Sequence, residues 1–152
     1  MSEYTATITW KKHTDETFTD NKYSRAHEWK FDGGSTVAAS SSPKVVPLPY
    51  SEESHVDPEE AFIASLSSCH MLFFLSFAAN KKYTVESYTD EASGIMQIDD
   101  NKKMSMTDVT LQPKIVFSGD NQPTQEQIDK IHHNAHKQCF IANSVKTKIH
   151  IK

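Results

Sequence analysis

Apolar and polar residues alternate near both ends of the chain, and this period of two is typical of β-strands with one buried face. The N-terminal apolar positions are Tyr4, Ala6, Ile8 and Trp10, and the C-terminal alternating positions are Val145, Thr147, Ile149 and Ile151. A second strand is expected over residues 27–31, followed by a tight turn at Asp32-Gly33-Gly34 and a returning strand over 35–40. The N-terminal third therefore predicts three short strands.

The middle of the chain predicts a helix that is apolar on every side. Asp57 and Glu60 form a capping-box pattern around Pro58, which suits the first position of a helix expected over 58–80. Residues 61–79 contain no Asp, Glu, Lys or Arg. Such a helix either spans a membrane or lies in a core. Its serines and its histidine favour the core, so we expect burial on all sides, with a second subunit helping to cover the helix.

The remaining chain predicts two long strands, over 83–98 and 104–117, and a second helix. Thr124 and Gln127 form the capping box of this helix, which ends near Cys139. The predicted order is three strands, a helix, two strands, a helix and a final strand. This order indicates an α+β fold, and the length of 152 residues suits one domain over 1–152.

Composition and charge exclude several classes of function. The chain has 16 basic and 20 acidic residues, a formal net charge of −4, so no basic surface for nucleic acid is indicated. Four glycines are too few for a phosphate-binding loop or a dinucleotide fingerprint. Residues 1–20 contain no apolar signal segment, and we expect a cytoplasmic protein with two reduced thiols that binds neither nucleic acid nor a membrane.

Cys69, Cys139 and Arg25 are the first candidates for chemistry. Cys69 lies about three turns into the apolar helix, where burial alone would make its thiol an inert core group. If the thiol is reactive, a cation from elsewhere in the fold must lie beside it. Arg25 is the only arginine in the chain and could supply a planar, bidentate donor, although an isolated surface arginine is the alternative.

The second helix carries a possible metal-binding pattern. His132, His136 and Cys139 follow one another at intervals of about one turn, which would suit zinc or copper. Cys139 continues the apolar stripe of the helix, however, and the histidines flank that stripe. Solvated histidines are the preferred interpretation, and no metal site is expected.

Several motifs resemble the OsmC/Ohr family of thiol peroxidases. The similarity covers nearly the whole chain and lies in four segments: Tyr23-Ser24-Arg25-Ala26-His27 with Asp32-Gly33-Gly34, Asp57-Pro58-Glu59-Glu60-Ala61-Phe62, Ser67-Ser68-Cys69-His70, and Ala135-His136-Lys137-Gln138-Cys139. The resemblance implies an intertwined α/β homodimer with central helices packed between sheets. It also implies the reduction of organic hydroperoxides, sometimes of hydrogen peroxide, in defence against oxidative stress.

Position by position, the resemblance makes Cys69 the peroxidatic cysteine and Cys139 the resolving cysteine. Arg25 corresponds to the arginine that activates the thiolate, and Glu59 to the glutamate after the helix-start proline. Phe140 stands where the organic-hydroperoxide branch has a proline, so the chain resembles an uncharacterised OsmC-like branch. The implied cycle needs no cofactor. Cys69 becomes a sulfenic acid, a Cys69–Cys139 disulfide forms, and an external dithiol reduces it.

Two further expectations concern the site. Apolar side chains near Cys69 would line the substrate pocket, namely Phe62, Leu66, Phe73 and Phe74, with Met71 and Phe77 as further candidates. Glu59 and Cys69 are ten positions, or about 15 Å, apart along one straight helix, so one arginine cannot bond both. Either the helix begins later than residue 58 or Glu59 comes from the other subunit, and we favour the second. The alternatives are a non-catalytic binding protein or redox sensor of the same fold and, less favoured, a His/Cys metal protein.

Overall fold

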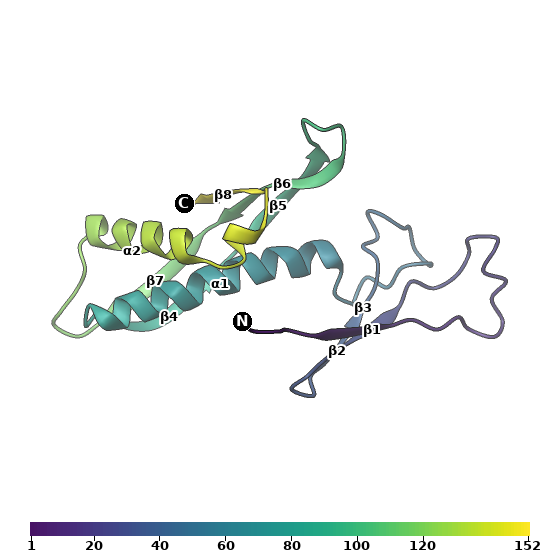
Figure 1. Cartoon of the computed structure of the whole chain (residues 1–152), viewed down its shortest axis with the longest axis horizontal. Helices are drawn as coiled ribbons and strands as arrows, with labels where there is room; N and C mark the ends of the chain where they lie inside the picture. Colours follow the sequence, from purple (N-terminus) through teal and green to yellow (C-terminus); the bar gives the residue numbers. More distant parts are fainter. The chain divides into compact units, whose positions relative to one another are not determined.

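Three antiparallel strands form the N-terminal part of the computed structural model, which describes all residues from Met1 to Lys152 (Figure 1). β1 (Ala6–Thr9), β2 (His27–Phe31) and β3 (Thr36–Ala39) lie in sequence order in one sheet. The turn after β2 is closed by the Gly34 N–H, which donates to the Phe31 carbonyl at 3.0 Å, and Gly34 has a φ of 92°. The three predicted strands are therefore present, with β1 shorter than the alternation suggested.

The predicted half-buried face of β1 is wrong for this chain by itself. All four of its residues are exposed, and Ile8 keeps 59% of its surface accessible. β1 is the edge strand of a three-stranded sheet, so the alternation of side chains marks a face that the chain itself leaves uncovered.

The chain divides into two compact units, Met1–Ala61 and Phe62–Lys152, with the boundary inside helix α1 (Pro58–Asn80). Both ends of α1 match the prediction. Its capping box is also confirmed, because Asp57 Oδ1 accepts from the Glu60 N–H at 2.8 Å and Glu60 Oε1 accepts from the Asp57 N–H at 2.9 Å. Whether the two units form one domain stays a prediction.

Helix α1 has one buried face and one exposed face. Leu66, His70, Phe74 and Ala78 follow each other every fourth residue and are buried. Ser68, Leu72 and Ser76 on the other side are exposed. Within one chain α1 is therefore covered along a single stripe, and burial of its other side by a second subunit stays a prediction. By length and composition alone α1 could also cross a membrane, a test that the core helix of a soluble protein passes equally.

Five strands form two sheets in the second unit. β4 (Thr84–Asp90) pairs antiparallel with β7 (Pro113–Ser118), while β6 (Met104–Leu111) lies between β5 (Ser93–Ile98) and β8 (Lys148–Ile151). β8 runs parallel to β6. The two long strands predicted from the sequence are thus four shorter ones, although the α+β class and the element order hold.

The Asp90 carboxylate, at the end of β4, forms a hydrogen bond at the point where the chain passes from β6 to β7. Asp90 Oδ1 accepts from the Gln112 N–H at 2.6 Å, and Asp90 Oδ2 accepts from the Ser67 hydroxyl at 2.5 Å. Pro113 follows and has no N–H to donate. The backbone at Gln112 therefore bonds to a side chain in place of a neighbouring strand, and β6 ends where β7 begins.

Helix α2 (Gln125–Gln138) begins with the predicted capping box, in which Thr124 and Gln127 exchange hydrogen bonds of 3.2 and 2.8 Å. A short 3₁₀ helix, η1 (Ala142–Ser144), follows it. The buried residues Ile131 and Ala135 of α2 pack with Phe74 and Ala78 of α1. A second core cluster joins Leu66 of α1 to Val109 and Leu111 of β6.

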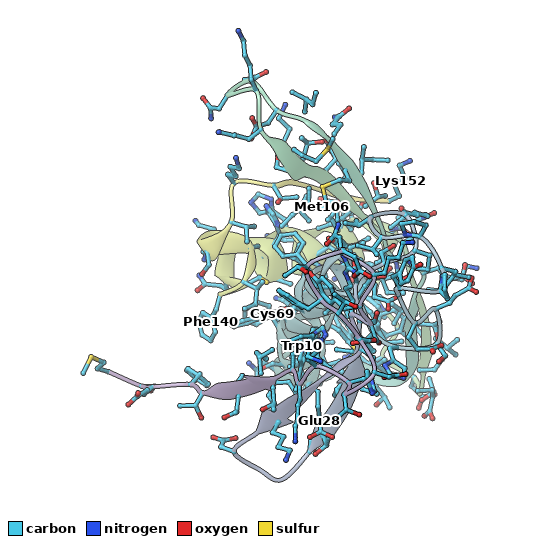
Figure 2. All side chains as sticks on the ribbon, turned by 90° about the vertical axis from the view of Figure 1, so that its right-hand side faces the viewer. Trp10, Glu28, Cys69, Met106, Phe140 and Lys152 are labelled. Atoms are coloured by element: carbon cyan, nitrogen blue, oxygen red, sulfur yellow. The ribbon has the colours of Figure 1, made fainter.

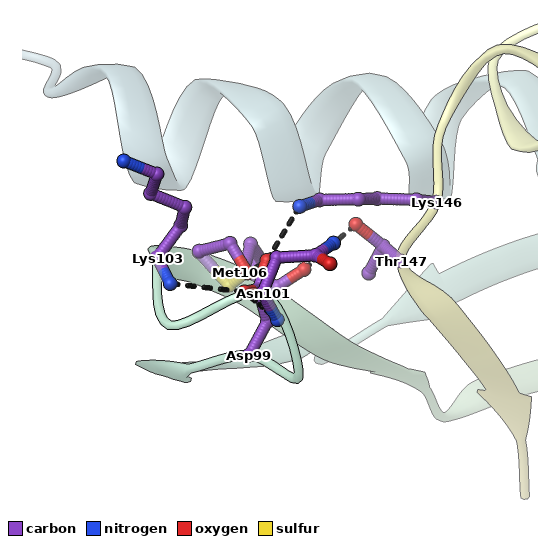
Figure 3. A network of polar contacts seen from close by, with 7 residues as sticks. Asp99, Asn101, Lys103, Met106, Lys146 and Thr147 are labelled. Carbon is purple, nitrogen blue, oxygen red and sulfur yellow. Dashed lines mark hydrogen bonds and ion pairs between the residues drawn. The ribbon is translucent and has the colours of Figure 1, made fainter.

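The β5–β6 hairpin is closed by a polar network around Asp99 (Figure 3). Its carboxylate accepts from the backbone N–H groups of Asn101 and Lys103, from the Ser105 hydroxyl and from the Lys146 ammonium. The bond from Lys146 is the main reason that the pKa of Asp99 falls to about 2. This network ties the segment before β8 to the hairpin.

Candidate functional site

The two cysteines meet between the two helices of the second unit. Cys69 lies on α1 and is partly exposed, whereas Cys139 directly follows α2 and is 1% exposed (Figure 2). Both thiols are free, and they lie close enough for Cys69 to help raise the pKa of Cys139. The helices run antiparallel, since Asn121, just before α2, donates to the carbonyls of Lys81 and Lys82, just after α1, whereas Cys139, just after α2, lies beside Cys69 in the middle of α1. The fold thus brings together two thiols that are seventy residues apart.

Cys139 is held as a protonated thiol. Burial raises its pKa to about 11, and the hydrogen bond to Cys69 adds to this effect. The Ala142 N–H, 3.4 Å from Cys139 Sγ, acts in the opposite direction. The Cys139 N–H donates to the Ala135 carbonyl at 2.9 Å, which fixes the residue at the end of α2. At neutral pH this thiol therefore keeps its proton.

A buried histidine pair lies beside the thiols along both helices. His70 is 1% exposed, and its Nε2 lies 3.0 Å from Nδ1 of His132, with the two rings stacked. Burial lowers the pKa of His70 to about 4, with smaller contributions from His132 and His136. Burial also lowers the pKa of His132. Both rings are therefore neutral near pH 7, and the sequence analysis did not single out His70.

No group of three or more His, Cys, Asp or Glu side chains is arranged to hold a metal ion. The spacing of His132, His136 and Cys139 suggested such a site. In the structure His132 instead bonds to His70, and the Cys139 thiol bonds to Cys69. These contacts occupy two of the three candidate ligands.

Arg25 and Glu59 line one cavity in the first unit. The cavity has a volume of about 540 Å³. Its walls are Ile8, Trp10, Phe18, Tyr23, Arg25, His27, Ser41, Pro58 and Glu59. Two of the predicted site residues thus share a cavity within one chain. Arg25 lies just before β2, and Glu59 lies in the first turn of α1.

Arg25 is fixed by the loop that precedes it. Its Nη1 donates to the carbonyls of Tyr23 at 2.5 Å and Asn21 at 3.0 Å, and its Nη2 donates to Asn21 Oδ1 at 3.0 Å. The guanidinium carbon lies 3.6 Å from the centre of the Tyr23 ring. Glu59 Oε2 is buried and has no hydrogen-bond partner. The chain therefore forms no bond between the arginine and the carboxylate, although both face the same cavity.

Three aromatic rings form the apolar wall of this cavity. Trp10 lies 5.7 Å from Phe18 and 5.6 Å from Tyr23, and Phe18 lies 4.6 Å from Tyr23, measured between ring centres. Two of these rings come from the charged segment 12–24, which showed no periodic pattern. Only Trp10 belonged to a predicted apolar face, so the sequence analysis missed this wall.

The predicted substrate-binding residues lie in several places of the second unit. Leu66 and Phe74 are fully buried in the two separate core clusters, and Phe62 packs beside Leu66. Phe73 contacts Phe140, with ring centres 5.0 Å apart and nearly perpendicular planes. Leu66 and Phe74 are therefore core residues, and a role for Phe62 and Phe73 in substrate binding stays a prediction.

An α+β fold with two interacting thiols between its helices defines a structural class, that of the OsmC/Ohr proteins. The chain belongs to the OsmC-like protein family, whose family model matches residues 51–152. This confirms the resemblance and the fold class inferred from the sequence.

Solved structures extend the similarity to the whole chain. An OsmC-like protein of unknown function from Vibrio cholerae is 58% identical, with a TM-score of 0.99 over 100% of this chain and 99% of that one. An organic hydroperoxide resistance protein OsmC from Legionella pneumophila is 16% identical, with a TM-score of 0.67 over 100% and 96%. OhrB of Bacillus subtilis, an organic hydroperoxide resistance protein, is 15% identical, with a TM-score of 0.63 over 98% of each chain. The last two show the fold alone, and a search of curated protein sequences finds no match.

Proposed function

We propose that this protein is a thiol-dependent peroxidase that reduces organic hydroperoxides, and hydrogen peroxide more slowly, in defence against oxidative stress. The observation that carries the proposal is that two free thiols, Cys69 of α1 and Cys139 at the end of α2, lie side by side, close enough for Cys69 to raise the pKa of Cys139. Family membership supports it, as do relatives of the same fold that are named organic hydroperoxide resistance proteins. We place the protein in the cytoplasm, where both thiols are kept reduced.

The first step uses Cys69, the more exposed of the two thiols. Its thiolate attacks the terminal oxygen of the hydroperoxide, the O–O bond breaks, and the alkoxide leaves as an alcohol after taking a proton. The sulfur becomes a sulfenic acid and is thereby oxidised by two electrons.

The second step uses Cys139. Its thiol loses a proton as its sulfur attacks the Cys69 sulfenic acid, the S–S bond forms, and the hydroxide leaves as water with that proton. An external dithiol then reduces the disulfide and restores both thiols. The raised pKa of Cys139, about 11, favours the thiol until the sulfenic acid has formed. The resolving group is therefore protected from direct oxidation, because the thiolate is the reactive form.

We assign Arg25 and Glu59 to the binding of peroxide and thiolate. Both line a cavity whose aromatic wall suits the organic part of a hydroperoxide. Glu59 and Cys69 are ten positions apart in α1, which corresponds to about 15 Å along a helix axis. We therefore propose a homodimer in which Arg25 and Glu59 of one subunit act on Cys69 of the other.

Peroxidase turnover with a defined pair of oxidants tests the proposal. We expect the protein to consume tert-butyl hydroperoxide faster than hydrogen peroxide, with dihydrolipoamide as the dithiol. Cys69→Ser should abolish turnover. Cys139→Ser should still reduce one equivalent of peroxide and leave a sulfenic acid that dimedone traps.

A redox sensor or binding protein of the same fold would behave differently. A sensor would form the Cys69–Cys139 disulfide with one equivalent of peroxide but would not turn over with dithiol. A binding protein would leave both thiols reduced. Either result would reject the peroxidase function while leaving the family assignment intact.

A further inference from the structure

A chain of hydrogen bonds runs along β2 to the backbone of Arg25. The indole N–H of Trp29 donates to His27 Nε2 at 3.1 Å, and His27 Nδ1 lies 2.7 Å from the Arg25 carbonyl oxygen. An indole nitrogen only donates, so Nε2 must carry the lone pair. The proton of the neutral ring is then on Nδ1, which donates to the carbonyl. Trp29 and the Arg25 carbonyl thereby favour the same tautomer of His27, Trp29 by donating to Nε2 and the carbonyl by accepting from Nδ1.

This bond completes a clamp around the Arg25 backbone. The Arg25 N–H donates to the Tyr50 carbonyl at 2.9 Å, and the Trp10 indole donates to the neighbouring Ser24 carbonyl at 2.8 Å. Arg25 itself lies outside the strand ladder, because the pairing of β2 with β1 extends only to Glu28 and that with β3 to His27. Two side-chain bonds and one backbone bond outside the sheet, rather than sheet pairing, thus determine how the arginine enters the cavity that it shares with His27.

We propose that His27, held in its Nδ1–H tautomer by Trp29, is the positioning residue for Arg25. This inference rests on the proposed function, since it assumes that Arg25 acts on the thiolate of Cys69. With the opposite tautomer, a lone pair on Nδ1 would face the carbonyl oxygen at 2.7 Å, and the two would repel. The Arg25 peptide would then move, and its guanidinium would lose the place set by Tyr23 and Asn21.

Three substitutions distinguish the effect of the Nδ1–H donor from the effect of the imidazole ring itself. Trp29→Phe keeps an aromatic ring but removes the donor. His27→Asn offers an amide N–H near the position of Nδ1, whereas His27→Gln places its amide near Nε2. We expect Trp29→Phe and His27→Gln to slow the oxidation of Cys69 by tert-butyl hydroperoxide about fivefold, because one hydrogen bond contributes about that factor. His27→Asn should restore most of the wild-type rate.

The half-reactions and a spectrum distinguish positioning from a general loss of structure. Stopped-flow measurement should show slower oxidation of Cys69 but an unchanged rate of disulfide reduction by dihydrolipoamide. The ¹⁵N spectrum of the His27 ring should show a single Nδ1–H tautomer in the wild type and a mixture in Trp29→Phe. His55→Gln is the matched control, because His55 Nδ1 lies 3.2 Å from the Ala39 carbonyl in the same unit without lining the cavity.

The possible outcomes test either the role of His27 or the proposed peroxidase function. Equal oxidation rates in wild type and Trp29→Phe, or the Nε2–H tautomer in the wild type, would overturn the inference. A fivefold loss in His55→Gln would show that any such imidazole bond has this effect, and would also overturn it. If the wild type reduces no peroxide, the proposed function fails, and the ¹⁵N spectrum still decides whether Trp29 selects the tautomer.

Discussion

At the scale of single residues, the packing of α1 against α2 controls which groups carry charge. Burial keeps Cys139 protonated and His70 neutral, although the two differ in the direction of their pKa shifts. Neither of these two neighbours therefore supplies a positive charge to the partly exposed Cys69. Any cation that activates its thiolate must come from another part of the fold, and Arg25 is the only guanidinium in the chain.

We expect Arg25→Lys to lower the peroxidase rate at least tenfold. Lysine keeps the charge, but it cannot donate at once to two backbone carbonyls and to Asn21 Oδ1, as the guanidinium does. Arg25→Ala should in addition shift the pH dependence of iodoacetamide alkylation at Cys69 to higher pH, because a nearby positive charge favours the thiolate. Overlapping alkylation curves for wild type and Arg25→Ala would remove Arg25 from the mechanism.

His70 makes the stability of the fold depend on pH. Its pKa is about 4 in the folded protein and 6.5 in the unfolded chain, so between these values the unfolded chain binds a proton that the folded protein does not. Stability is therefore highest above pH 6.5 and falls as the pH decreases towards 4. The loss amounts to about 3 kcal/mol, from a pKa difference of 6.5 against about 4.

Urea unfolding at pH 7 and pH 4 tests this dependence. The variant His70→Leu replaces the titrating ring with an apolar side chain that can stay buried. Its free energy of unfolding should therefore fall less between pH 7 and pH 4. Because other groups titrate in this range too, the difference between the two proteins is the quantity to measure. An equal loss of stability in both would show that His70 does not cause it.

At the scale of helices and strands, the local signals in the sequence were sufficient for the first residues of both helices. Asp57 with Glu60 and Thr124 with Gln127 begin the helices where the capping boxes predicted. These predictions succeed because a cap depends on residues three positions apart.

The breaks within the long strands depend on distant residues and could not be predicted. Asp90 accepts from Gln112, 22 positions later, and thereby ends β6. The same limit applied to the site. Both cysteines and Arg25 were proposed from residue type and from resemblance, whereas the ring of Phe18 in the cavity and the bond of His70 to His132 arise only from tertiary contacts.

Gly94 sets the approach of β5 to α1. A Cβ at this position would lie 2.5 Å from Met106 Sδ and 2.8 Å from Ile63 Cδ1. We expect Gly94→Ala to destabilise the protein by about 1 kcal/mol, since both side chains must shift to accept the methyl group. Thermal unfolding would show a lower midpoint.

Gly33→Ala provides the matched control for Gly94→Ala. A Cβ at Gly33 would meet no atom within 4 Å. Its effect should be neutral or slightly stabilising, because alanine restricts the unfolded chain more than glycine does. Equal effects of the two substitutions would show that close packing at Gly94 is not the cause.

At the scale of the whole molecule, each of the two units exposes large apolar side chains. Leu72 on α1 is 61% exposed and Phe140 is 69% exposed. In the first unit Ile8 is 59% and Tyr4 is 90% exposed. Large apolar side chains left this exposed mark interaction surfaces, and the apolar composition of α1 suits a second copy of the chain better than water.

We expect a stable homodimer that buries more than about 2,000 Å² in total, the range of obligate dimers. Light scattering at micromolar concentration should give the mass of two chains. Leu72→Glu should shift the protein towards monomers, because the interface would have to bury an unpaired carboxylate. Leu72→Met keeps the apolar contact and should remain dimeric.

If Arg25 and Glu59 act on Cys69 of the other subunit, the monomeric variant should also lose peroxidase turnover while its Cys69 and Cys139 still form a disulfide with a chemical oxidant. A wild-type monomer in this experiment would contradict both the dimer and the shared site.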